Sequence, residues 1–358
     1  MPSSSSITST LRGRARGQRF TVARAGVVLT LLTVALVVSV AVGLTVGSTH
    51  VSLLDLLQPS RLGAAGVDPA TIVLEVRLPR VLLAVAVGAG LSAAGVCFQA
   101  LLRNPLADPY ILGISGGAGL GSILASVLAP AVGTAVLFVR PLSAFVGSLA
   151  AVGFLLLLAR RRGRILPETM ILMGVVVNAT IMAAIIFIIT MTDFSRYAGT
   201  MYWLMGSLSS PSMAELSLLF FCLAVGIGTL SFLGQGLNVL AGGEEQASQL
   251  GLNVPRVRMA ALMAGSLMTA AAVALSGLTG FVGLMVPHLC RAWLGPDNRL
   301  LVSASALTGA IILVIADTGA RALFAPTQIP VGVITALFGG PCFLWLFARQ
   351  GAAGGRAA

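Results

Sequence analysis

The chemistry-bearing side chains are sparse in this sequence, and their densest group is a short acidic segment enclosed by glycines. Gly242 and Gly243 precede Glu244 and Glu245, and Gly251 follows six residues later. Carboxylates in a first turn interact favourably with the helix dipole, and glycine commonly ends a helix. The segment therefore predicts a helix of about two turns. Its remaining predicted members include Gln246, Ala247 and Leu250. A solvated loop helix without any partner fits the same pattern equally well.

Charged side chains also stand at the ends of apolar runs. Asp317 and Arg321 are four residues apart, which places them on one helix face and predicts an ion pair at a helix end. Arg77 and Arg80 begin another apolar run. These residues suit electrostatic contacts with a partner or with each other.

A third feature is a proline-rich turn at the end of the run that Arg80 begins. Asn104 and Pro105 open the sequence NPLADP, whose two prolines force non-helical backbone. The turn therefore ends a helix sharply.

The sequence does not predict a metal or nucleotide site. His50 and His288 have no third ligand nearby, so a structural role is favoured for both. The four cysteines lie in apolar segments without a CxxC spacing, and we expect them to pack. They are Cys97, Cys222, Cys290 and Cys342. No GxxxxGK[ST] motif occurs, so the chain is not expected to cradle nucleotide phosphates itself.

Composition places these residues in a membrane protein. Hydrophobic residues make up 57% of the 358 positions, charged residues 9%, and the mean hydropathy is +0.99. Soluble domains carry about a quarter charged residues. All 22 basic residues are arginine, and none is interleaved with aromatics as nucleic-acid binding requires. The 42 glycines suit helices that pack closely in lipid.

Charge-free runs predict an all-α polytopic bundle of about ten transmembrane helices. The predicted spans are 25–47, 81–102, 111–129, 141–159, 169–191, 211–233, 259–276, 281–294, 300–320 and 331–348. Residues 1–24 are expected to form a disordered basic arm, 25–348 a single transmembrane domain and 349–358 a cytoplasmic tail. We split 259–290 into two spans because Gly and Pro interrupt it, as in the broken helices of transporters.

Arginine asymmetry supports this topology. With ten spans, sixteen arginines fall on the cytoplasmic side and six outside. One fused span over 259–290 changes the balance to thirteen against nine. Both termini of this multi-pass protein are therefore predicted to be cytoplasmic.

Six motifs in order, between residues 77 and 345, resemble the FecCD-type permeases of ABC importers for iron-siderophores, haem and cobalamin. They read RLPR, QALxxNPLAxP, YWLMGSL, GExxAxxLG, FVGLxVPHxxR and IPVGxITA. The resemblance implies the family's dimer of ten-helix bundles around a central pathway. It also implies two ATPase subunits that bind ATP and Mg, so no cofactor is expected in this chain. The resemblance further implies that the membrane is the bacterial cytoplasmic membrane.

The resemblance assigns roles to the features above. The family's coupling loop corresponds to Glu244–Gly251, which would dock in the ATPase subunit. The arginines that would meet acidic residues of a solute-binding protein match Arg77, Arg80 and Arg321. A cytoplasmic gate matches Asn104, Pro105 and Leu106 together with Glu168. The sequence departs from the family's small hydroxyl residues at Pro167 and Glu168, which leaves the gate's chemistry open.

The sequence therefore predicts a non-enzymatic permease subunit that forms a translocation pathway. An iron-siderophore is the leading candidate for its cargo, and haem and cobalamin are the alternatives. The dimer partner would be a second copy or a related chain, and the remaining surface would face lipid. Two other classes are weighed. An ion-gradient-driven secondary transporter would need intramembrane relay groups, and Asp317 alone is weak support for them. A membrane receptor is disfavoured because no soluble output domain is found in the sequence.

Overall fold

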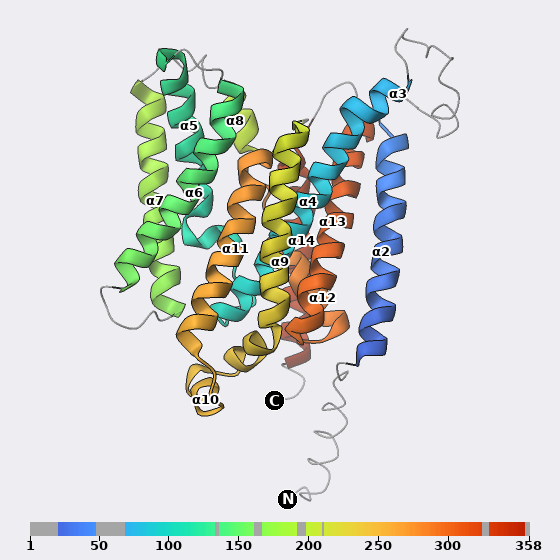
Figure 1. Cartoon of the computed structure of the whole chain (residues 1–358), viewed down its shortest axis with the longest axis vertical. Coiled ribbons are helices and arrows are strands. Elements are labelled where there is room, and N and C mark those ends of the chain that lie inside the picture. Colours follow the sequence, from blue (N-terminus) through green and yellow to red (C-terminus); the bar gives the residue numbers. More distant parts are fainter. Residues whose placement is uncertain are drawn as a thin grey trace, which may run out of the picture.

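The computed structural model describes residues 21–47, 69–132, 136–160, 167–191, 198–209, 211–323 and 329–354, and this part of the chain is helical without any strand. Ten long helices form a bundle (Figure 1). They are α2 (Val22–Thr45), α4 (Leu78–Leu101), α5 (Ile114–Val132), α6 (Val136–Arg160), α7 (Pro167–Met191), α9 (Met213–Ala241), α11 (Val254–Ser276), α12 (Val282–Leu294), α13 (Asn298–Leu323) and α14 (Val331–Gly354). The predicted all-α bundle of about ten helices is confirmed.

Five short elements connect the long helices. They are α3 (Pro69–Thr71), the π-helical η2 (Ile72–Arg77), the 3₁₀ turn η3 (Pro109–Leu112), α8 (Ala198–Leu204) and α10 (Glu244–Gln249). Seven of the described helices are long and apolar enough to cross a membrane, and two further apolar stretches, 114–128 and 331–344, are shorter.

Two helix ends predicted from the sequence are wrong: the start of the second long helix, which was predicted after Arg80, and the end of α9, which was predicted before Gly234. The second long helix continues backwards from α4 through η2 and α3 to Pro69, whereas the sequence predicted a loop up to residue 80. Arg77 lies inside this continuous helix because backbone carbonyls of α2 bind its guanidinium. Likewise, α9 runs through Gly234 to Ala241, so the predicted loop 234–258 is much shorter. Gly234 lets α9 pack against the backbone of Arg299.

Other predicted features differ in extent or cannot be compared. The predicted loop 192–210 contains α8, and α14 continues six residues beyond the predicted end at 348. His50, most of the predicted arm and the basic segment 161–166 lie outside the described residues.

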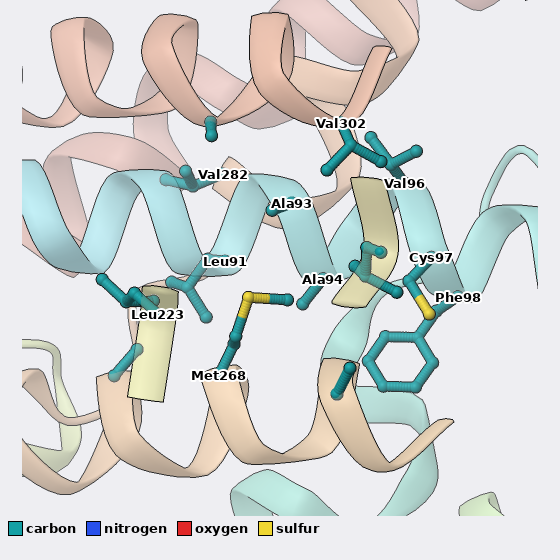
Figure 2. Packing of buried hydrophobic residues seen from close by; sticks show 14 of the residues in the cluster. Leu91, Ala93, Ala94, Val96, Cys97, Phe98, Leu223, Met268, Val282 and Val302 are labelled. Carbon is teal, nitrogen blue, oxygen red and sulfur yellow. The ribbon is translucent and has the colours of Figure 1, made fainter. Parts of the chain in front are cut away.

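Helix α4 is the centre of the bundle, because almost its whole circumference is buried. Figure 2 shows its side chains Leu91, Ala94 and Phe98 among Leu223 of α9 and Met268 of α11, with Val282 of α12 and Val302 of α13 beside the same helix. Small residues allow this close approach. A Cβ added to Gly88 would lie 2.3 Å from the carbonyl oxygen of Gly309 on α13. Packing of this kind stabilises helices in lipid, where burial of apolar surface contributes little.

The remaining helices flank this core. In Figure 1, α5, α6, α7 and α8 form one side of the bundle and α2 forms the opposite edge. The short helix α10 lies at the same end of the bundle as the start of α2. The start of α2 and the acidic segment therefore lie on the same side of the bundle, and the cytoplasmic location of that side stays a prediction.

Candidate functional site

The acidic segment forms the predicted short helix, α10, which projects from the bundle (Figure 1). Gly243 and Gly251 bound it with φ angles of +131° and +80°, which other residues adopt only under strain. The Leu252 N–H donates to the carbonyl of Ala247 across the helix end, as in a glycine-terminated Schellman turn. Ala247 is fully buried in the core, whereas Leu250 is 75% exposed. One face of α10 is therefore anchored and the other presents an apolar side chain to solvent.

An ion pair attaches α10 to the next long helix. The Glu244 carboxylate accepts a hydrogen bond from the guanidinium of Arg258, which lies in the early part of α11. Glu245, Gln246 and Gly251 are exposed. A displacement of α10 would therefore be transmitted to α11 through a side-chain link as well as through the chain.

The proline-rich turn after α4 is exposed and tightly hydrogen-bonded. The Asn104 side-chain oxygen accepts the Leu106 N–H at 2.9 Å, and the Asn104 carbonyl accepts the Ala107 N–H at 3.0 Å. Pro105 and Leu106 are exposed, as is Glu168 in the first turn of α7. Within the described residues, no hydrogen bond or ion pair joins Glu168 to the turn, so their joint action as a gate stays a prediction.

The predicted ion pair between Asp317 and Arg321 is confirmed, with Nε and Oδ2 2.9 Å apart. The sequence missed its third member: Arg80 of α4 binds the same carboxylate, with Nη2 2.9 Å from Oδ1. Arg77 lies nearby and donates to the carbonyls of Leu44 and Thr45 at 2.8 and 2.9 Å.

This arginine cluster crosslinks α2, α4 and α13. Arg321 also donates to the carbonyl of Gly43 on α2 at 3.1 Å. The side chains of Arg80 and Arg321 are 14% and 10% exposed, and Arg77 is buried. The geometry therefore shows a structural crosslink, while docking of a binding protein on these arginines stays a prediction.

A cavity of about 530 Å³ lies between α7, the segment after the proline-rich turn, and the break between α11 and α12. Its wall is mostly apolar, with a few polar groups. The lining residues are Asp108, Tyr110, Ile111, Val175, Asn178, Ala179, Met182, Gly280, Phe281 and Leu284. Asn178 lines this cavity, whereas Gln99 and Trp203 are buried in the bundle.

Two groups of hydrogen-bonded polar residues involve the elements that line the cavity. Arg291 of α12 donates to Gln99 at 2.8 Å, and Gln99 donates to the carbonyl of Leu284 at 3.1 Å. The Tyr110 hydroxyl bonds to the backbone of Thr279 in the α11–α12 break. Sequence reasoning missed the role of Tyr110, because an apolar run with one tyrosine carries no signal of its distant backbone partner.

A group of polar residues joins α9 to the loop between α12 and α13 and to the first residue of α13. Asn238 of α9 donates to the Asp297 carboxylate at 2.8 Å and accepts the N–H of Asn298 at 2.8 Å. Hydrogen bonds from the Arg299 guanidinium lower the pKa of the Asp297 carboxyl to about 2. This loop is outside the membrane-spanning segments, and its charge pair fixes the start of α13.

Comparison with known proteins agrees with this geometry. The sequence profile of the FecCD transport family matches residues 32–349. The chain is 42% identical to a cobalamin import system permease protein of Halobacterium salinarum, over 77% of this chain and 73% of that one. It is 41% identical to a hemin transport system permease protein of Yersinia pestis, over 77% and 83%.

A solved structure is similar as well. It is an inward-facing conformation of a transporter of the metal-chelate ABC type, with a TM-score of 0.78 and 29% identity, over 91% of this chain and 99% of that chain. The profile match, the related permeases and the ten-helix bundle all point to one conclusion. This chain is a polytopic membrane permease that belongs to the FecCD transport family.

Proposed function

We propose that this chain forms the translocation pathway of a binding-protein-dependent ABC importer for a metal chelate. An iron-siderophore is the leading candidate for this cargo. The observation that carries the proposal is α10, a rigid helix with an exposed apolar Leu250 and an ion pair to α11. A chain without a phosphate-binding loop needs such an element to receive work from a separate ATPase. Similarity to cobalamin and hemin permeases supports a bulky chelate as cargo.

In this proposal two ATPase subunits, which bind ATP and Mg, engage α10 of two permease copies. Closure of the ATPases pushes α10 and tilts α11 as a rigid body, which opens or closes the pathway. The cavity of about 530 Å³ contributes part of the pathway wall, and the turn at Asn104–Leu106 with Glu168 narrows its cytoplasmic end. A solute-binding protein delivers the cargo near Arg80 and Arg321 at the opposite end.

The competing class is an ion-gradient-driven carrier. Such a carrier needs ionisable groups free to exchange a proton or an ion within the bundle. Asp317 instead forms ion pairs with two arginines, so its carboxylate is not free to act as a relay group. A carrier without a coupling subunit would also have no partner for the exposed Leu250 on α10.

Uptake into proteoliposomes tests the proposal. The permease is reconstituted with the candidate ATPase, with and without the binding protein, and challenged with labelled ferric siderophores, haem and cobalamin. We expect uptake of one cargo class that requires both ATP and the binding protein. Uptake driven by an imposed proton or sodium gradient without ATP would contradict the importer and favour the carrier.

A further inference from the structure

The break between α11 and α12 is an irregular segment in the middle of the bundle. Residues 277–281 are not helical, and both Gly277 and Phe281 have a φ of +66°. Backbone polar groups inside a membrane protein need partners from elsewhere in the chain when the helix does not supply them. The hydrogen-bond partners of residues 277–281 therefore identify the elements to which the break is attached.

One partner is the side chain of Tyr110. Its hydroxyl donates to the Thr279 carbonyl and accepts the Thr279 N–H, each at 3.1 Å. A single side chain therefore satisfies both polar groups of this peptide residue. The ring packs against two separate apolar clusters, so its position is fixed by its surroundings.

On its other side, Tyr110 is part of a hydrogen-bonded unit with the proline-rich turn. The Tyr110 N–H donates to the Asp108 carboxylate at 2.8 Å, and the Ile111 N–H donates to the Asp108 carbonyl at 3.1 Å. Ala107 is bonded in turn to Asn104. The turn and η3 therefore form one unit, in which Tyr110 is the residue that reaches the break by hydrogen bonds.

The opposite side of the break contacts different elements. The Gly332 N–H at the start of α14 donates to the carbonyl of Gly206, just after α8, at 3.0 Å. Added Cβ atoms at Gly206 and Gly332 would lie 2.6 and 2.8 Å from the carbonyl oxygen of Leu278. The break is thus enclosed by the α8–α14 contact on one side and by Tyr110 on the other.

We propose that Tyr110 is a positioning residue for translocation, which links the cytoplasmic turn at 104–107 to the α11–α12 break through the Thr279 peptide. The inference rests on the proposed function, in which α11 receives the movement of α10. Displacement of the break would reach the α8–α14 contact by direct packing. It would reach the turn through the packing of Gly283 on Pro109 and through the two hydrogen bonds of the Tyr110 hydroxyl. The hydrogen bonds hold the Thr279 peptide at a fixed position relative to the turn, so we expect them to carry most of the coupled change between the two ends of the pathway.

Thiol labelling of the assembled transporter tests this link without any knowledge of the cargo. Leu106→Cys and Met205→Cys place reporters at two positions that are 39% and 55% exposed, each in a cysteine-free background with the ATPase present in nanodiscs. Labelling rates are compared without nucleotide and after trapping with ATP and vanadate. In the parent we expect both rates to change. With Tyr110→Phe we expect the change at position 106 to shrink about fivefold or more, and that at 205 to persist.

Ser148→Ala is the matched control, because it removes another buried hydroxyl, one that bonds to the carbonyls of Ile114 and Ala144 away from the break. It should leave both responses intact, and melting temperatures should show that all variants are folded. An unchanged response at 106 in Tyr110→Phe, or loss of both responses in a folded protein, would overturn the link while the importer stands. A parent without any nucleotide response would overturn the proposed function and the link together.

Discussion

At the scale of single residues, the carboxylate of Asp317 is 1% exposed and binds guanidinium groups from two helices. Two cations around one buried anion are stable only while the anion is present. Removal of one member of a buried pair leaves charge uncompensated and costs on the order of 3 to 5 kcal/mol. The crosslink among α2, α4 and α13 therefore depends on the Asp317 carboxylate.

We expect Asp317→Asn to lower the melting temperature of the detergent-solubilised protein by several degrees, which thermal unfolding monitored by tryptophan fluorescence would measure. Glu245→Gln is the control, because it makes the same chemical change on an exposed residue. Equal melting temperatures for the two variants would show that the crosslink contributes nothing to stability.

Asp297 gives a pH-dependent prediction. Its pKa in the folded protein is about 2, below the ordinary value of 3.8, so the group stabilises the fold above pH 3.8. This contribution is lost as the pH falls from 3.8 through 2, because the carboxyl is protonated first in the unfolded state and then, below pH 2, in the folded state as well. The melting temperature of the parent should exceed that of Asp297→Asn at pH 6, and the difference should become small as the pH approaches 2. A difference that is constant across this range would contradict the charge pair with Arg299.

At the scale of elements, α10 separates assembly from coupling. Leu250→Asp puts a charge on the exposed apolar tip, so the ATPase should dissociate in pull-down assays while the melting temperature is unchanged. Glu244→Gln breaks the ion pair to Arg258 but leaves the tip intact. We expect the ATPase to remain bound and the number of cargo molecules carried per ATP to fall. Gln249→Asp is the exposed control for Leu250→Asp. Full ATP-driven uptake by Leu250→Asp would contradict docking at α10.

The contact between α4 and α13 can be tested with two glycines of one helix. A Cβ at Gly309 would lie 1.9 Å from the Ser92 hydroxyl oxygen and 2.3 Å from the Gly88 carbonyl oxygen, whereas one at Gly319 would meet nothing within 4 Å. Gly309→Ala should therefore destabilise the bundle by about 1 to 3 kcal/mol. Gly319→Ala should be neutral or slightly stabilising, because alanine favours helix. Denaturation of both variants in the same detergent would measure the difference, and similar values would refute the close contact.

At the scale of the whole molecule, the topology makes a prediction that is independent of energetics. Cysteines introduced at Gly251 and Trp293 should be shielded from an impermeant thiol reagent added outside intact cells, in a cysteine-free background. Both should react once the membrane is opened. Labelling of either from outside would reverse the orientation that the sixteen-to-six distribution of arginines predicts.

The sequence predicted the number and order of the long helices because most of them are long apolar runs with few charges, and because Gly and Pro mark the break before the short helix α12. It failed where a charge or a glycine has a distant partner. Arg77 marked a loop in the sequence, yet carbonyls from α2 hold it inside a helix. Gly234 was interpreted as the end of a helix, yet it lies inside α9, where it packs closely against the backbone of Arg299.

The candidate sites divide in the same way. The glycines around α10 are local signals, so this helix was predicted. The Arg80–Asp317 bond joins residues 237 positions apart, and the Tyr110–Thr279 contact joins residues 169 apart. Neither leaves a periodic pattern in one sequence, since each depends on how helices are stacked.

The central position of α4 has a consequence for how such a protein can diverge. Nearly every side chain of this helix touches a neighbour, so an exchange there requires a second exchange opposite. The outward side chains of α2, such as Leu31 at 65% exposed, carry no such constraint. A saturation library should therefore be depleted along α4 and permissive along the outer face of α2. If the cavity lines the proposed pathway, exchanges among its lining residues could alter the cargo while the helix at the centre is left unchanged.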